Sequence, residues 1–239
     1  MLTSCLMAVA IASTATAFTP PGAQPVSTKN LTVAFGNTLA INGMNLPRDA
    51  TGSAPSLGTA EKLTGTYAIL MVDLDIPPAM EGGATSQLLH WMQTGLESAN
   101  TSTTIAGTKV FELVNPSKAS PVAAYRQPNP PNRNPVSHRY TQFLVNTTGN
   151  TAALASLTQA GATIRNFSAA NVIKSAGVDV AAGNWFNVTN ANATGAGTNG
   201  ASQTNSTSQA AAGGAVRMTG NSGAALAGLW LLVAAVAIL

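Results

Sequence analysis

The chain has 239 residues, of which only 8% are charged, and its formal net charge is +3, whereas an average globular chain carries roughly 25% charged residues. Nucleic-acid binding needs clustered Lys and Arg to contact phosphates, and the sequence contains no such cluster, so this class of function is excluded. The apolar share of 45% is enough to bury a core, which excludes a wholly disordered chain.

Residues 1–17 predict a signal peptide. An apolar run from Leu6 to Ala12 is followed by Ala15-Thr16-Ala17, a small-x-small triplet that signal peptidase accepts, so we expect cleavage before Phe18. The segment lacks the Lys or Arg that usually precedes such a run. A buried N-terminal helix is the alternative, but the prolines and glycine at 20–22 would break it. The single cysteine, Cys5, would leave with the signal, and the mature chain would have no disulfide.

Between residues 18 and 190, which we expect to form one folded domain, strand signals outnumber helix signals. One short helix is predicted after Ser168, an N-cap ahead of Ala169–Ser175, and it should end at Gly177. Alternating or continuous apolar runs predict strands over Leu31–Phe35, Thr66–Val72, Leu88–Thr94, Lys109–Val114 and Arg139–Asn146. The fold class is therefore mainly β, a largely antiparallel domain with one or two short helices.

The C-terminal part predicts a stalk and a membrane anchor. Residues 191–213 hold no charge and are almost entirely small or polar, so they cannot bury enough apolar surface to fold. The small triplet Gly213-Gly214-Ala215, the spacer Val216–Gly223 and the apolar tail Ala224–Leu239 together indicate a GPI-attachment signal over 214–239. Gly213 is the expected attachment residue, although any position in 211–214 fits. A short tail anchor and a segment of the folded core are the alternatives for the apolar tail. The protein would then be displayed on the outer face of the plasma membrane or in the cell wall.

Asn-x-Ser/Thr sequons occur along the whole chain, and we expect about half of them to carry glycan in a secreted protein. They lie at Asn30, Asn100, Asn146, Asn166, Asn187, Asn192 and Asn205.

The candidate chemistry lies on four titratable residues. His90 and His138 are the two histidines of the chain, and Asp73 and Asp75 end an apolar strand one residue apart, so both acids should face one side of it. Two imidazoles and two carboxylates could bind a metal or act as an acid–base pair. Helical His-x-x-x-His spacing, Cys-x-x-Cys and a Gly-x-Ser-x-Gly nucleophile motif are all missing from the sequence. We therefore expect no catalytic residue, no metal and no cofactor.

Taken in order, several segments resemble the two signature regions and the closing strand of the phosphatidylethanolamine-binding proteins. The segments are Tyr67–Pro77, Leu89-His90-Trp91, Tyr125–Tyr140, Asn166-Phe167-Ser168 and Ala182–Phe186. The resemblance implies a large central antiparallel sheet with a smaller flanking sheet and a few short helices. It also implies a small anion pocket, lined by Asp73, Asp75, His90, Tyr125, Pro130, Pro131, His138 and Tyr140.

Three departures from the family pattern affect the rim of that pocket. Leu74 stands where the family has proline, the loop from Pro131 to His138 is about one residue longer than is typical of the family, and the Ser-Arg that usually follows the Asp-x-Asp-x-Pro motif is missing.

The expected pocket suits recognition rather than catalysis. Two carboxylates should raise the pKa values of the neighbouring imidazoles, and the cationic rings, with the Tyr140 hydroxyl, could donate to phosphate oxygens. We therefore expect a cell-surface protein that binds a phospholipid headgroup or another small anion. One alternative, also a capacity of the family, is inhibition of a carboxypeptidase-type serine protease by surface contact. Another is a surface or adhesion protein whose pocket is vestigial.

Overall fold

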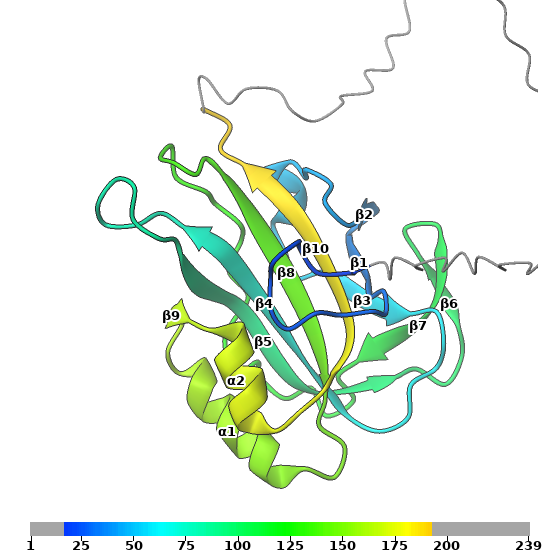
Figure 1. The fold of residues 1–239 in the computed structure, drawn as a ribbon. Coiled ribbons are helices and arrows are strands. Elements are labelled where there is room, and N and C mark those ends of the chain that lie inside the picture. Colours follow the sequence, from blue (N-terminus) through cyan, green and yellow to red (C-terminus); the bar gives the residue numbers. More distant parts are fainter. Residues whose placement is uncertain (1–16, 193–239) are drawn as a thin grey trace, which may run out of the picture. The chain divides into compact units, whose positions relative to one another are not determined.

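A computed structural model describes residues 17–192 (Figure 1). The predicted stalk and GPI signal, and all but the last residue of the predicted signal peptide, lie outside this range. The helical elements are η1 (Arg48–Thr51), α1 (Thr151–Gly161) and α2 (Ala169–Ala176). The strands are β1 (Thr32–Phe35), β2 (Thr38–Ala40), β3 (Ser56–Thr59), β4 (Tyr67–Ile76), β5 (Ser86–Ser98), β6 (Thr103–Ile105), β7 (Thr108–Val114), β8 (Ser137–Asn146), β9 (Arg165–Phe167) and β10 (Val180–Thr189).

The strands follow one path in the order β10-β8-β4-β5-β7-β3-β1-β2, with every neighbouring pair antiparallel. The long strands β10, β8, β4 and β5 form a large sheet, and the shorter β7, β3, β1 and β2 form a smaller one. The two parts are joined where the end of β5 pairs with β7, at Glu97 and Ser98. The predicted fold class, a large antiparallel sheet flanked by a smaller one with short helices, is confirmed.

Strand β4 lies in the middle of the large sheet, and its first nine residues are buried. Successive side chains of a strand point to opposite faces, so β4 contributes to two cores. Ile69 and Met71 belong to an inner cluster with Tyr140 and Phe186. Their neighbours Ala68, Leu70 and Val72 belong to a second cluster under the helices, with Leu157 of α1 and Ile173 of α2 among its members. A continuous apolar run is therefore required here, because neither face of β4 meets water.

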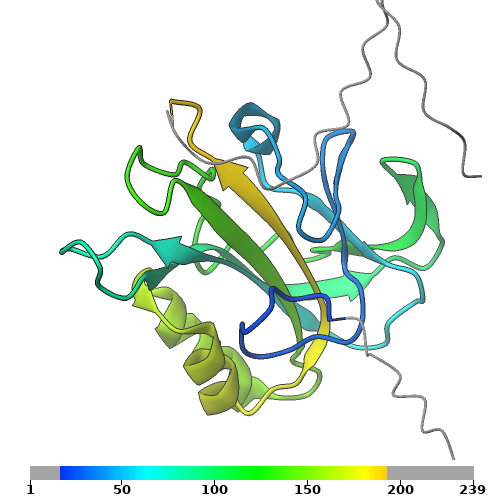
Figure 2. The same ribbon diagram turned by 45° about the horizontal axis from the view of Figure 1, so that its top comes forward.

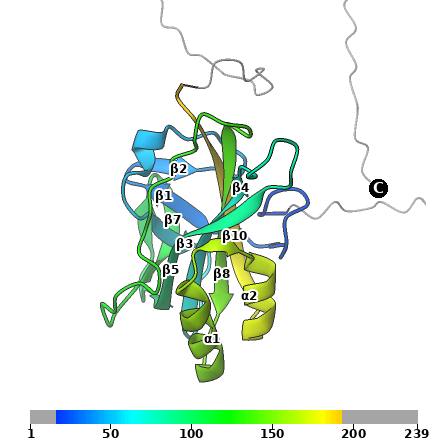
Figure 3. The same ribbon diagram turned by 90° about the vertical axis from the view of Figure 1, so that its left-hand side faces the viewer.

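Both helices lie side by side against one face of the large sheet (Figure 3). The predicted helix is confirmed as α2: the Ser168 hydroxyl accepts from the Asn171 N–H at 3.3 Å, and Gly177 ends the helix with a left-handed φ of 63°. Helix α1 was not predicted; it begins after Asn150, whose side chain accepts from the Ala153 N–H. Within residues 17–192, neither helix is long and apolar enough to cross a membrane.

The outer edge of β10 is covered by chain that precedes and follows β1 and β2. Asn30 forms a parallel bridge with Gly183, and Asn45 forms another with Asn187. The Gly43 N–H also donates to the Trp185 carbonyl at 3.0 Å. These contacts bring the two ends of the strand path together, so that the sheet curls into a nearly closed barrel (Figure 2).

Candidate functional site

The predicted site centres on Asp73, near the end of β4. Its Oδ2 atom lies 2.7 Å from His138 Nδ1 and 3.9 Å from His90 Nε2. His138 is on β8 and His90 is on β5, the two strands that flank β4. Both imidazoles therefore converge on a single carboxylate oxygen, although the three residues are far apart in the sequence.

A β-bulge aims His90 at this position. Met71 pairs with Trp91 and Val72 pairs with Leu89, so His90 is an extra residue in β5 without a partner on β4. A bulge of this kind re-aims side chains locally. Consequently Trp91 belongs to the inner cluster, and the adjacent His90 also reaches that side, with its ring 5.1 Å from the ring of Tyr140.

His138 lies between two hydrogen-bond acceptors. Nδ1 lies 2.7 Å from a carboxylate oxygen of Asp73, and Nε2 lies 3.0 Å from the Pro135 carbonyl oxygen. Both neighbours can only accept, so each is satisfied when the ring donates from both nitrogens. His138 is 1% exposed and Asp73 is 1% exposed. The geometry therefore suits a buried imidazolium–carboxylate pair.

His90 is in a different state. Its Nδ1 donates to the Arg126 carbonyl at 2.8 Å, and Nε2 forms no hydrogen bond with a described residue. Burial lowers the pKa of His90 below its usual value, and this outweighs the Arg126 carbonyl and the Asp73 charge, which both act to raise it. The prediction that the carboxylates raise the imidazole pKa values is thus wrong for His90, because desolvation disfavours the charged ring.

Tyr140 connects the two imidazoles. Its ring stacks on Phe186 at 5.6 Å and lies 6.4 Å from the ring of His138. Burial, and then the charge of Asp73, raise the pKa of Tyr140 far above its usual value. The phenol therefore keeps its proton at physiological pH and remains a possible donor.

Asp75 has a different partner from Asp73. Its carboxylate accepts from the Arg139 side chain at 2.6 and 2.7 Å and from the Arg139 backbone N–H at 2.8 Å. The pairing of β4 and β5 is irregular between Asp73 and Ile76, which breaks the simple alternation that would put both acids on one side. No hydrogen bond or ion pair joins Asp75 to either imidazole within the described residues. The expectation that the two acids act together is replaced by two separate ion pairs.

The remaining predicted residues lie on the segment between β7 and β8. The Tyr125 hydroxyl donates to the Thr51 carbonyl at 2.7 Å, and its ring meets Trp91 edge-on at 6.3 Å. Pro130 is buried and its carbonyl accepts from Asn190 at 2.6 Å, whereas Pro131 is exposed. These three residues support the segment that carries the Arg126 and Pro135 carbonyls, and they make no recorded hydrogen bond to an imidazole.

Asp73, His90, His138 and Tyr140, which we call the imidazole cluster, are enclosed by the protein and do not line an open pocket within residues 17–192. His90 is 5% exposed, and Asp73, His138 and Tyr140 are buried more deeply still. Five cavities of about 210 to 360 Å³ indent the described part of the chain, and none of these five is lined by the four residues. The open, preformed pocket that was expected is not among them.

Sequence reasoning missed Arg139 and the two carbonyls that hold the imidazoles. Arg139 lies between His138 and Tyr140, and strand alternation alone places it on the opposite face, where a partner acid could have been sought. The carbonyls of Arg126 and Pro135 carry no side-chain signal. Among residues 17–192, no three His, Cys, Asp or Glu side chains form a metal-ligating group.

The predicted glycosylation sites differ in their surroundings. Asn187 is half-buried in β10, and its side-chain nitrogen donates to the Gly43 carbonyl at 2.9 Å, so a glycan there would have to displace this bond. Asn205 and the predicted anchor residue Gly213 lie outside the described residues. The exposed sequon residues are Asn30, Asn100, Asn146, Asn166 and Asn192.

Comparison with known structures shows the fold. The chain is similar to a carboxypeptidase Y inhibitor solved in complex with its cognate proteinase, with 16% identity, a TM-score of 0.52, and coverage of 69% of this chain and 85% of that one. It is also similar to phosphatidylethanolamine-binding proteins of Plasmodium vivax (19% identity, TM-score 0.47, 67% and 84% covered) and Plasmodium falciparum (18%, 0.44, 66% and 83%). No curated protein sequence matches the chain.

The family itself is shown by a sequence model. The model of the phosphatidylethanolamine-binding protein family matches residues 30–183. The match includes all four residues of the imidazole cluster and the Asp75–Arg139 pair. With more than half of its length covered, the chain belongs to the phosphatidylethanolamine-binding protein family.

Proposed function

We propose that this protein is a cell-surface binding module that holds the phosphate of a phospholipid headgroup, or another small anion, at His138 and His90, and that it does not turn over a substrate. The observation that supports this most directly is the convergence of both imidazoles on Asp73 Oδ2. The carboxylate keeps His138 doubly protonated and oriented, so the ring presents a cationic N–H at Nε2. No nucleophile accompanies the pair in the cluster.

An anion could bind in this closed site if one of its oxygens replaced the Pro135 carbonyl as the hydrogen-bond acceptor of His138. His138 Nε2 donates to the Pro135 carbonyl, which is a neutral acceptor, and a phosphate oxygen forms a stronger, charge-assisted bond to the same N–H. His90 Nε2 becomes a second donor once that ring is protonated. Because burial lowers the pKa of His90, anion affinity should increase as the pH falls below about 6.5, the ordinary value for His.

The test is an NMR titration of both imidazoles with inorganic phosphate and with phosphorylethanolamine. We expect saturable shifts in the His90 and His138 ring signals, with tighter binding at pH 5.5 than at pH 7.5. His90→Gln should remove the pH dependence while weak binding at His138 persists. Phosphate that leaves both ring signals unchanged at every pH would refute the proposal.

A control is needed because His138 is structurally important. Replacing His138 leaves the buried Asp73 carboxylate without its partner, so His138→Ala could destabilise the protein. The fold of this variant must therefore be checked by circular dichroism. The matched control is Arg133→Ala on the neighbouring exposed loop, whose side chain contacts the carbonyls of Pro78 and Ala79. This variant removes a nearby cation and leaves the imidazole cluster intact. Equal loss of binding in Arg133→Ala and His90→Gln would place the anion on the loop and not on the imidazoles.

Inhibition of a serine carboxypeptidase is the second candidate function. It is supported by the likeness in fold to the carboxypeptidase Y inhibitor, and inhibition by surface contact does not require the buried imidazoles. Assays of carboxypeptidase Y with the wild-type protein and with His90→Gln distinguish the two functions. Equal inhibition by both proteins, together with lost pH-dependent phosphate binding in the variant, would show that the surface and the imidazole cluster act independently.

A further inference from the structure

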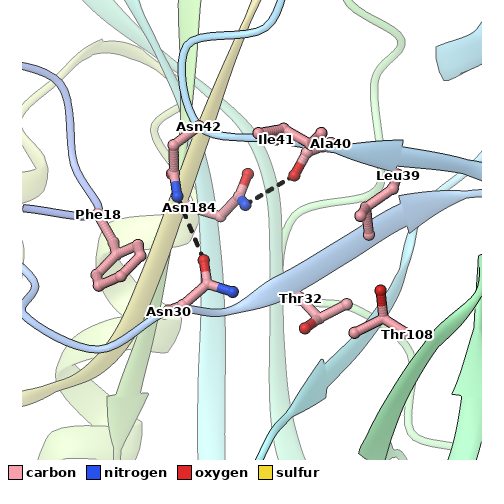
Figure 4. Close-up of a pocket in the computed structure, with 9 residues that line it drawn as sticks. All are labelled: Phe18, Asn30, Thr32, Leu39, Ala40, Ile41, Asn42, Thr108 and Asn184. Atoms are coloured by element: carbon pink, nitrogen blue, oxygen red, sulfur yellow. Dashed lines mark hydrogen bonds between the residues drawn. The ribbon is translucent and has the colours of Figure 1, made fainter. Parts of the chain in front are cut away.

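A second polar pocket lies at the seam where the barrel closes, well separated along the sequence from the imidazole residues (Figure 4). It has a volume of about 280 Å³ and is formed by the N-terminal segment, β1, β2 and the chain after it, the start of β7, and β10. We call it the amide pocket. It is lined by Phe18, Asn30, Thr32, Leu39, Ala40, Ile41, Asn42, Thr108 and Asn184.

The lining of the amide pocket suits a neutral, hydroxyl-rich ligand. It combines three carboxamides and two threonines with apolar side chains and contains no charged residue, so neither an anion nor a cation would find a counter-charge. Ile41 on its rim is 58% exposed, and a ligand with an apolar face would cover it. Sugar rings present hydroxyls at their edge and C–H groups on their faces, which matches this mixture.

Asn184 at the base of the pocket has an unmet hydrogen-bonding capacity. The residue is 2% exposed; its Nδ2 donates to the Ala40 carbonyl at 3.0 Å, and its Oδ1 has no partner. Buried polar atoms in native proteins are nearly always paired. A hydroxyl or amide N–H bound in the pocket, directly or through an ordered water, supplies the missing donor.

Asn30 on the rim of the same pocket is an acceptor for N-glycosylation. It begins the sequon Asn30-Leu31-Thr32, and Asn30 and Thr32 both line the pocket. The Asn30 Oδ1 atom accepts from Asn42 Nδ2 at 3.3 Å. Its Nδ2 forms no hydrogen bond with a described residue and is turned toward Thr32 (Figure 4).

The contacts of Asn30 are compatible with a glycan. On glycosylation Nδ2 bonds to the anomeric carbon of an N-acetylhexosamine and loses one hydrogen, while the lipid pyrophosphate carrier leaves that carbon. The carboxamide oxygen keeps its lone pairs, so the bond from Asn42 survives. Asn187 is the opposite case, because its Nδ2 is already engaged with the Gly43 carbonyl inside β10.

We propose that the amide pocket binds the first N-acetylhexosamine of a glycan that is attached to Asn30. The ring covers Ile41, and its polar groups reach Asn42 and Asn184 across the seam between β10 and the segment after β2. The glycan thereby stabilises the contact between β10 and the segment after β2, at which the barrel closes, and does not only project into solvent. The proposal rests on passage through the secretory pathway, as predicted from residues 1–17.

A neighbouring cavity provides an internal control. It also has a volume of about 280 Å³ and shares Asn30 and Thr32, but its lining includes the charged residues Lys29 and Glu61. A neutral sugar ring placed there would have to desolvate these charges without replacing their partners. The glycan should therefore be coupled energetically to Asn42 and not to Glu61.

The test uses protein secreted by a eukaryotic host and trimmed with an endoglycosidase that leaves one sugar on each modified asparagine. Glycopeptide mapping should find that sugar on Asn30. The melting temperature of this protein should exceed that of Asn30→Gln by about 2–4 °C, the shift expected for a modest stabilisation of a domain of this size. The same comparison in an Asn42→Ala background should show no difference, whereas a Glu61→Gln background should keep the full difference.

Several outcomes would overturn the proposal. The first is that Asn30 carries no sugar. The second is that the sugar raises the melting temperature equally with and without the Asn42 side chain, and the third is that this rise disappears in the Glu61→Gln background. Asn42 also accepts from the Trp185 N–H at 3.0 Å, so Asn42→Ala could fail to fold. In that case a Thr108→Ala background, which lacks a lining hydroxyl on the opposite wall, takes the place of Asn42→Ala. The difference in melting temperature between the glycosylated protein and Asn30→Gln should then be smaller. Asn100→Gln, at an exposed sequon away from the pocket, should leave the melting temperature unchanged.

Discussion

At the residue scale, Asp73 determines the character of the candidate site. Its Oδ2 accepts from His138, and its Oδ1 accepts from the Asp75 N–H at 2.8 Å, so both oxygens are used inside the protein. Asp73→Asn would leave the His138 imidazolium without its counter-ion in a buried position. Removing one partner of a buried pair costs about 3–5 kcal/mol. We expect the free energy of unfolding, measured with urea, to fall by this amount.

The control for this substitution is Asp49→Asn. The Asp49 side chain is 93% exposed and lies 3.7 Å from Arg48, so its ion pair is screened by water and contributes little. The urea midpoint of this variant should match that of the wild type. A loss below about 1 kcal/mol for Asp73→Asn would show that the Asp73–His138 pair is not the buried ion pair described above.

His90 should make the stability of the protein depend on pH. Burial lowers its pKa in the folded state, whereas in the unfolded chain the ring titrates near 6.5. Above about pH 6.5 the ring is neutral in both states, so its contribution is fully present. As the pH falls below that value the unfolded chain takes up a proton that the folded protein resists, and stability decreases by up to about 1.4 kcal/mol per pH unit.

Urea unfolding between pH 7.5 and pH 5.0 measures this dependence. His90→Gln keeps a polar side chain and removes the titration, so its stability should vary less over the same interval. The carboxylates are common to both proteins, so their contribution cancels in the comparison. Identical pH profiles for the variant and the wild type would show that His90 is not responsible.

At the element scale, the sequence predicts where the strands lie but not how they are bent. The apolar run Thr66–Val72 was sufficient to predict β4, because a strand buried on both faces must be apolar throughout. The bulge that aims His90 at Tyr140, and the irregularity that separates the partners of Asp73 and Asp75, leave no such pattern. They arise from pairing with other strands. The approach of both imidazoles to Asp73 was therefore predictable, whereas the Arg139 partner of Asp75 and the backbone carbonyls that hold the imidazoles were not.

The two helices show the same limit. Helix α2 was predicted because Ser168 caps its first turn with a side-chain oxygen and Gly177 ends it with a left-handed backbone conformation. Helix α1 was missed because its buried side consists of Ala153, Leu157 and Gly161, a narrow stripe with only one large apolar residue. Gly161 fits there because a Cβ would lie 2.4 Å from Val122, and that close approach is a property of the packed fold alone.

Helix α1 should depend on its N-cap. The Asn150 side chain accepts from the Ala153 N–H at 2.9 Å, and it satisfies one of the first N–H groups of a helix that has little apolar surface of its own. Asn150→Ala should lower the free energy of unfolding by about 1 kcal/mol, measured with urea. Asn150→Asp, which can still accept the bond, should restore most of the loss. Equal losses in the two variants would show that the cap contact does not stabilise the helix.

At the scale of the whole molecule, closure of the barrel involves three asparagines to which sequence reasoning gave no structural role, and only one of them, Asn187, was predicted as a glycosylation site. Asn187 bonds to the Gly43 carbonyl across 144 positions of the chain. Asn42 accepts from the Trp185 N–H, and Asn184 donates to the Ala40 carbonyl. Asn42 thus satisfies a backbone N–H of β10, whereas Asn184 and Asn187, which lie in β10, satisfy backbone carbonyls of β2 and of the segment after it. These backbone groups lie at strand edges and would otherwise be unpaired. The abundance of asparagine in this region thus has a structural role as well as a predicted covalent one.

The same closure bears on the predicted N-terminal boundary of the mature protein. The Phe18 N–H donates to the Ser27 carbonyl at 2.8 Å, and the Phe18 side chain lines the amide pocket. Cleavage before Phe18 would turn that N–H into an ammonium that can still donate to Ser27, so the fold tolerates a terminus at this position. We expect the protein secreted from a eukaryotic host to begin at Phe18, as determined by N-terminal sequencing. Ala17→Gln should impair processing there, because signal peptidase requires a small residue before the cleaved bond, and a terminus beyond Ser27 would contradict the role of Phe18 in the closed barrel.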